Sequence, residues 1–163
     1  RLRQHQPVYR FEDALQGEIT VPAALAEEDF IVRRRDGLYA YNLAVVVDDM
    51  DSGITEIVRG ADLLEPTVRQ IALYQTLGAD VPAWVHLPLA VLADGNKLSK
   101  QNHAPALAQD DVRPALWQAL AFLGQCPPPC LRENTVDEII AWGIAHWQLA
   151  RVPRPQKKVL GAR

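Results

Sequence analysis

The segment from residue 54 to residue 92 constrains the fold of this 163-residue chain more than any other. Residues 54–59 (ITEIVR) are rich in β-branched side chains, which predicts a short buried strand. Pro66 suits the first turn of a helix that extends to about Leu77. Residues 84–89 (WVHLPL) then predict a second strand. This strand–helix–strand order is typical of an α/β fold with a parallel sheet.

The flanking segments predict further elements of mixed type. A continuous apolar run at residues 41–47 fits a buried helix and a buried strand equally well, because periodicity cannot separate the two. Other segments have clearer signals: a hairpin with strands at 8–12 and 18–21, a connector or short helix at 22–28, a strand at 29–33, a helix at 112–123, and a helix that begins with a capping box at Thr135 and Glu138.

A loop with two lysines follows the second predicted strand. Residues 94–103 (DGNKLSKQNH) place Lys97 and Lys100 three positions apart, on either side of Ser99. A lysine side chain is a compact charge on a flexible stem, which suits it to polyphosphate. Because ligands of such sheets bind beyond the carboxyl ends of the strands, we expect Arg59 and this loop to face one crevice. The alternative is a solvated turn with two surface lysines.

Composition and charge limit the class of protein. An apolar fraction of 48% and a charged fraction of 23% are typical of a soluble globular protein. The chain has neither a bilayer-length apolar segment nor a signal peptide, so we expect a cytoplasmic protein without a membrane partner. The net charge is −3, but residues 151–163 hold five basic residues and no acid. Such a basic tail is expected to be solvated and disordered.

Two clusters could in principle bind a metal, and we expect neither to do so. Asp48, Asp49 and Asp51 lack the glycine and the distal glutamate of a calcium loop, so solvation of a helix end explains them better. Cys126 and Cys130 flank three prolines without a third ligand at suitable spacing. They are also too few for a disulfide framework, which favours a reducing compartment.

Several segments together resemble one enzyme family. Residues 97–101 (KLSKQ) are similar to the KMSKS-type signature of class I aminoacyl-tRNA synthetases. Residues 41–49 (YNLAVVVDD), 53–64 (GITEIVRGADLL) and 67–75 (TVRQIALYQ) resemble the glutamyl-specific branch. Residues 100–107 (KQNHAPAL), and a short C-terminal region in place of a long anticodon-binding one, point to the glutamyl-Q tRNA(Asp) synthetases, truncated paralogues of glutamyl-tRNA synthetase. The resemblance covers about residues 1–149.

The resemblance implies a fold and a division into domains. The chain would hold the second half of a class I synthetase Rossmann-like nucleotide-binding domain, followed by a small helical region. In order, we expect the end of an acceptor-type insertion at 1–28, the half-domain at 29–104, the helical region at 105–150 and the basic tail at 151–163.

The resemblance also implies an activity. The family activates L-glutamate with ATP, together with Mg²⁺, to glutamyl-adenylate and transfers the glutamate to the queuosine of tRNA(Asp). By position, Tyr41 and Arg59 match its glutamate-binding residues, and Lys100 matches its catalytic, ATP-contacting lysine. The expected ATP-binding loop comprises Lys97, Leu98, Ser99, Lys100 and Gln101. The expected partners are L-glutamate, ATP and tRNA(Asp), with a monomeric protein. Without the resemblance, a core tyrosine and a strand-end salt bridge would explain Tyr41 and Arg59.

The chain departs from the family at its start. It begins at Arg1, and the family's HIGH-type motif and zinc-binding cysteine cluster, both expected upstream, are absent from the sequence. Zinc is therefore expected in the family, but its ligands are missing from this chain. We expect a fragment that is inactive by itself. The alternatives are a fragment of an ordinary glutamyl-tRNA synthetase and a non-catalytic remnant that binds tRNA or another partner.

Overall fold

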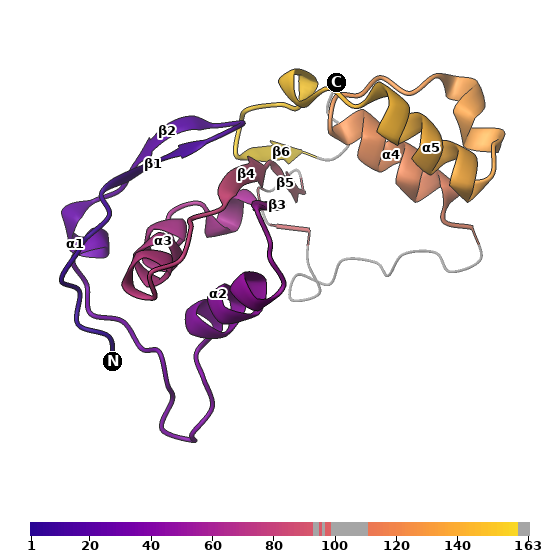
Figure 1. Cartoon of the computed structure of the whole chain (residues 1–163). Helices are drawn as coiled ribbons and strands as arrows, with labels where there is room; N and C mark the ends of the chain where they lie inside the picture. Colours follow the sequence, from indigo (N-terminus) through magenta and orange to yellow (C-terminus); the bar gives the residue numbers. More distant parts are fainter. Residues whose placement is uncertain (93–94, 96, 99–110, 160–163) are drawn as a thin grey trace. The chain divides into compact units, whose positions relative to one another are not determined.

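The computed structural model describes residues 1–92, 95, 97–98 and 111–159. The chain divides into two compact units, Arg1–His86 and Leu87–Arg163. Figure 1 labels the helices and strands of both units. The sequence predicts domain boundaries after residues 28, 104 and 150, and these boundaries remain predictions. In the described part of the chain, none of the helices combines the length and the apolar character that crossing a membrane requires.

The first unit contains mixed helices and strands, which confirms the α/β class. Its antiparallel hairpin confirms the predicted one, with Arg10 opposite Thr20. Strands β3 and β4 are hydrogen-bonded neighbours, and helix α3 lies between them in the sequence. The elements in chain order are β1 (Arg10–Asp13), β2 (Gly17–Thr20), α1 (Ala23–Ala26), α2 (Tyr41–Asp51), β3 (Glu56–Gly60), η1 (Ala61–Leu63), α3 (Thr67–Thr76) and β4 (Ala83–Leu87).

Helix α3 lies at the centre of the apolar core of this unit. Ile71 and Tyr74 are buried, as the sequence predicts for an inner helix face. Side chains from the hairpin, α2 and β4 join them, and the cluster comprises Phe11, Val21, Ala26, Phe30, Val46, Leu64, Val68, Ile71, Leu73, Tyr74 and Trp84. Burial of such side chains stabilises a fold by roughly 1.5–3 kcal/mol each. Ile57 of β3 packs against this core and Trp84 of β4 lies within it, so the core holds the two strands in place.

For this unit, the structure decides one open alternative and corrects two predictions. The apolar run at 41–47 is helical, since it lies within α2 (Tyr41–Asp51). The strand predicted at 29–33 is wrong, because Phe30 and Arg33 form only isolated bridges, to Leu2 and Tyr39. The segment pairs singly with two different partners and so forms no continuous ladder. Strand β3 exists, but it is not fully buried, since Val58 is 54% exposed.

The second unit combines a two-stranded sheet with a helical hairpin. Its elements in chain order are β5 (Leu89–Val91), α4 (Arg113–Phe122), η3 (Pro129–Glu133), α5 (Val136–His146), η4 (Leu149–Arg151) and β6 (Lys157–Val159). Strands β5 and β6 are parallel, with Leu89 opposite Lys157. The expectation of a disordered basic tail is therefore wrong for Lys157–Val159, because the backbone of this segment completes a sheet.

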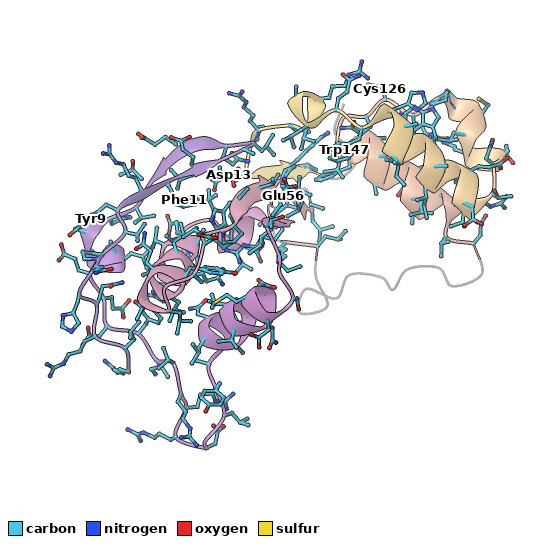
Figure 2. The ribbon with its side chains drawn as sticks, viewed as in Figure 1. Tyr9, Phe11, Asp13, Glu56, Cys126 and Trp147 are labelled. Atoms are coloured by element: carbon cyan, nitrogen blue, oxygen red, sulfur yellow. The ribbon has the colours of Figure 1, made fainter. Side chains whose placement is uncertain are left out.

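Local signals explain the ends of the two helices in this hairpin. Helix α4 ends at Phe122, and Gly124, directly after the C-cap Leu123, has a φ of +75° that suits a residue without a Cβ. Helix α5 begins with the predicted capping box: the Thr135 side chain accepts from the Glu138 N–H, and the Glu138 carboxylate accepts from the Thr135 N–H. Cys126 and Trp147, both labelled in Figure 2, belong to this unit.

Candidate functional site

The guanidinium of Arg59 is the centre of a polar site in the first unit. Its Nε donates to Nε2 of His86 at 3.0 Å, and its Nη1 donates to Oε1 of Gln70 at 2.6 Å. Its Nη2 donates to the Thr67 hydroxyl at 2.7 Å and to the Leu63 carbonyl at 3.3 Å. All three nitrogens are thus engaged, which holds the plane of the guanidinium in one orientation.

The residues around Arg59 come from three separate elements, η1, α3 and β4. Thr67 and Gln70 lie one turn apart on α3, and both polar side chains are buried beside the apolar residues Val68 and Ile71 of the same helix. The ring of Trp84, on β4, lies under the guanidinium, 4.8 Å from its central carbon. Apolar packing of α3 and β4 therefore fixes the acceptors before any ligand binds.

A buried ion-pair-like contact supports this arrangement from behind. Oδ2 of Asp13 lies 2.7 Å from Nδ1 of His86, and both side chains are fully buried. The other carboxylate oxygen of Asp13 accepts from the backbone N–H groups of Leu15 and Gln16. Figure 2 labels Asp13 at the end of the first strand of the hairpin, which lies next to β4. The polar chain thus runs from Asp13 through His86 to Arg59.

Helix α2 contacts the same network through its first turn. Oδ1 of Asn42 accepts from Nε2 of Gln70 at 3.2 Å, so Gln70 links Arg59 to α2. The predicted glutamate ligand Tyr41 is the first residue of α2 and is 57% exposed. Its exposure excludes the alternative of a core tyrosine. The structure therefore brings Arg59 and the start of α2 to one polar site.

Burial and charge shift the pKa values of several groups here. Burial lowers the pKa of Arg59, and the nearby Tyr41 and Asp49 oppose that effect. Burial also raises the pKa of Asp49, which the charge of Arg59 counteracts. Burial lowers the pKa of His86; the hydrogen bond to Asp13 raises it, and the charge of Arg59 lowers it further. The site is partly buried and contains one firmly held cation, Arg59, which suits an anionic ligand.

The lysine loop belongs to the second unit. Lys97 forms an isolated bridge with Val91, and the backbone N–H of Leu98 donates to the Ala90 carbonyl at 2.9 Å. The described residues of the loop therefore contact β5 (Leu89–Val91), whereas the strand predicted at 84–89 ends at Leu87 as β4. The other expected ATP-binding residues, Ser99, Lys100 and Gln101, lie outside the described residues. A crevice shared by Arg59 and the loop remains a prediction, because the two belong to different units.

The described residues contain no group of three or more His, Cys, Asp or Glu side chains that could hold a metal ion. Asp48, Asp49 and Asp51 lie in the last turns of α2. Cys126 and Cys130 are exposed free thiols. Two thiols alone do not fit a tetrahedral zinc site.

Sequence reasoning missed the acceptors that hold Arg59. His86 interrupts an otherwise apolar strand, and a lone polar residue inside such a strand is a usable signal for a buried polar contact. Thr67 and Gln70 occur at helical spacing on the inner face of a predicted helix, which is a second signal. Asp13 carried no such signal, because an aspartate at a hairpin corner is ordinary turn chemistry.

Comparisons with known proteins agree on one family. The family described as tRNA synthetases class I (E and Q), catalytic domain, matches residues 1–140. A protein from Serratia proteamaculans named glutamyl-Q tRNA(Asp) synthetase is 63% identical over 154 residues, which are 94% of this chain and 51% of that protein. A protein of the same name from Pectobacterium atrosepticum is 60% identical over 153 residues, or 94% of this chain and 48% of that protein.

A solved structure shares the fold. The crystal structure of a glutamate tRNA ligase from Elizabethkingia meningosepticum, in complex with its amino acid, matches with a TM-score of 0.68 at 23% identity. The match covers 94% of this chain and 34% of that one. The chain spans about half the length of the curated relatives above. By its sequence and its fold, this chain belongs to the class I tRNA synthetases (E and Q), and residues 1–140 match their catalytic domain.

Proposed function

We propose that this chain supplies part of the active site of an enzyme that activates L-glutamate with ATP and transfers the glutamyl group to the queuosine of tRNA(Asp). The observation that carries the proposal is the immobilised guanidinium of Arg59, in a chain about 60% identical to proteins named for that activity. A partly buried, oriented arginine is well suited to recognise a carboxylate.

Arg59 would bind a carboxylate of glutamate, and Tyr41 would donate its hydroxyl to the same substrate. The Nη1 nitrogen donates to a single acceptor, Gln70, whereas Nη2 donates to two. We therefore assign the substrate carboxylate to Nη1. Since Tyr41 is exposed at the first turn of α2, its hydroxyl can meet a ligand without moving the core.

The lysine loop would provide the charge that adenylation needs. In this reaction a carboxylate oxygen of glutamate attacks the α-phosphorus of ATP, the bond to the β-phosphate bridging oxygen breaks, and pyrophosphate leaves. Little proton transfer is required, so catalysis depends on alignment and on neutralising the pyrophosphate. Lys100 would stabilise the leaving group, with Lys97, Leu98, Ser99 and Gln101 forming the rest of the ATP-binding loop. Mg²⁺ would enter bound to the phosphates of ATP.

The proposal also includes the cellular location and the oligomeric state of the enzyme. A protein that consumes ATP and modifies tRNA would act in the cytoplasm, and we propose a monomer. The isolated 163-residue chain is expected to show negligible adenylation, because the matched relatives are about twice as long.

Glutamate-dependent exchange of pyrophosphate into ATP tests the first step. The full-length protein should catalyse it without tRNA, and then transfer labelled glutamate to tRNA(Asp) that contains queuosine. Transfer to the 3′ end of tRNA(Glu) instead would indicate a glutamyl-tRNA synthetase. Binding of tRNA with no exchange under any condition would contradict the proposal and favour a binding remnant.

A further inference from the structure

We infer that His86, held by Asp13, is a positioning residue that fixes the guanidinium of Arg59 for its ligand. The inference rests on the proposed function for the identity of that ligand, L-glutamate. It adds a role for two residues, Asp13 and His86, that are linked by a hydrogen bond to each other and, through Nε2 of His86, to Arg59.

The hydrogen bonds determine where the proton of the imidazole lies. Asp13 accepts two backbone N–H groups at Oδ1, from Leu15 and Gln16, and its Oδ2 faces Nδ1 of His86. A carboxylate in this position requires a donor, so Nδ1 carries the hydrogen. Nε2 of a neutral ring then has a lone pair, which accepts the Nε–H of Arg59. With a hydrogen on Nε2, His86 and the Nε–H of Arg59 would be two donors that face each other without an acceptor.

Thr67 completes the set of groups that face Nε2. Its hydroxyl oxygen lies 3.2 Å from Nε2 of His86 and 2.8 Å from the Leu63 carbonyl oxygen. Since the hydroxyl can donate to Leu63 while it accepts from Nη2 of Arg59, it leaves the Nε2 lone pair to Arg59. Within the described residues, the charged groups that these contacts place against His86 are Asp13 from β1 and Arg59 from β3.

Packing prevents the imidazole from rotating to another arrangement. The ring of Trp84 stacks on it with an interplanar angle of 17°, and the edge of Phe11 meets it at 63°. Trp84 also carries the guanidinium of Arg59 on its face. Two rings and one carboxylate thus set a single tautomer and a single ring plane of His86, and the position of Nε of Arg59 follows from them.

The variant Asp13→Asn tests the inference directly. The Asn amide oxygen can still accept the two backbone N–H groups, while its NH₂ donates to Nδ1 and drives the hydrogen of His86 onto Nε2. We expect the KM for glutamate to rise about tenfold or more, the scale of one hydrogen bond to a charged group. The KM for ATP should change by less than about twofold, and ¹⁵N NMR of the imidazole should show the tautomer change.

Two variants of His86 serve as a matched pair. His86→Gln places an amide oxygen near the position of Nε2 and should keep the glutamate KM within about threefold of the original. His86→Leu has no acceptor and should match Asp13→Asn in its glutamate KM. Equal KM values for His86→Gln, His86→Leu and the original protein would overturn the inference. An Asp13→Asn protein with a switched tautomer and an unchanged glutamate KM would do the same.

NMR separates this inference from the proposed function and from a failure to fold. The Nε–H of Arg59 should give a protected signal at neutral pH in the original protein and in His86→Gln, and lose its protection in Asp13→Asn and His86→Leu. If the full-length protein lacks glutamate-dependent exchange, the proposed function fails while these signals still decide the positioning role. An original protein with the hydrogen of His86 on Nε2 refutes the positioning role even if both His86 variants fail to fold.

Discussion

Asp13 and His86 form a buried hydrogen bond of 2.7 Å, although 73 residues separate them in the sequence. The bond joins the corner of the N-terminal hairpin to strand β4. Both side chains are fully excluded from water, so neither can exchange its partner for solvent. The hairpin, which carries no proposed ligand of its own, is thereby tied to the residue that holds Arg59.

The stability of this unit should fall as the pH falls below about 7. The pKa of His86 is lowered in the folded protein, chiefly by burial, so the unfolded chain takes up a proton first. Stability is therefore full above the ordinary histidine pKa of about 6.5 and is lost below it, by at most about 1.4 kcal/mol per pH unit for one group. Urea unfolding between pH 5 and 8 measures this slope. A reduced slope in His86→Gln assigns it to His86; an identical slope contradicts the assignment.

Replacement of Arg59 by lysine should weaken glutamate binding. A single ammonium cannot reproduce the planar set of donors that Arg59 directs to His86, Gln70 and Thr67. We expect the glutamate KM in pyrophosphate exchange to rise about tenfold or more, with little change in the KM for ATP. Arg69→Lys is the matched control, because Arg69 pairs with Glu28 in the same unit, outside the polar site. A similar change in both variants would point to a general loss of structure.

Removal of the Lys100 charge should act on the rate of adenylation. Lys100→Ala is expected to lower kcat of exchange by about 10²–10³-fold, the effect of losing one charge-stabilising donor. Its glutamate KM should stay nearly constant. Arg154→Ala removes an exposed charge from the basic segment near the C-terminus and should leave the rate unchanged. An unaltered rate in Lys100→Ala would exclude the catalytic role assigned to that lysine.

Gly124→Ala should strongly destabilise the helical hairpin. A Cβ at this position would lie 2.2 Å from the carbonyl oxygen of Arg151, in addition to the strain of its φ of +75°. Gly78 has a φ of +69° but open space around its Cβ position, so Gly78→Ala isolates the strain. We expect about 1 kcal/mol for Gly78→Ala and about 3 kcal/mol or more for Gly124→Ala in denaturant unfolding. Equal losses of unfolding free energy in the two variants would show that the backbone of Arg151 moves away from the added Cβ.

Loss of the capping box should weaken α5 by about 1 kcal/mol. Thr135→Ala removes the hydroxyl that accepts from the Glu138 N–H. Thr135→Ser retains that oxygen and should behave like the original protein in thermal unfolding. If Ser and Ala at position 135 give the same melting temperature, the hydroxyl contributes nothing.

Elements with short-range signals could be predicted from the sequence. The hairpin, helix α3 after Pro66, strand β4 and the capping box at Thr135 all depend on neighbouring residues, and all are present. Arg59 could be selected because it follows a strand and lies in a segment that resembles a family motif. These features need no knowledge of distant parts of the chain.

The rest depends on contacts between distant residues. The helical state of residues 41–47 follows from packing against α3, which no periodicity reveals. The segment 29–33 has strand-like side chains, but among the residues that the structure describes it forms only isolated bridges and no ladder. The acceptors of Arg59 come from α3 and β4, and Asp13 comes from the hairpin, so only the folded chain brings them together. The lysine residue expected to be catalytic, Lys100, lies outside the described residues.

The parallel pairing of β5 with β6 sets an order of events during synthesis. Strand β5 leads into the lysine loop, but its partner is among the last described residues of the chain. On the ribosome, the edge of β5 that faces β6 must therefore wait until Val159 has left the exit tunnel. Bringing β6 next to β5 closes the long segment of chain between these two strands. This closure is slow compared with forming the helical hairpin that lies between them in the sequence. The base of the proposed ATP loop is thus among the last parts of this chain to reach its final hydrogen bonding.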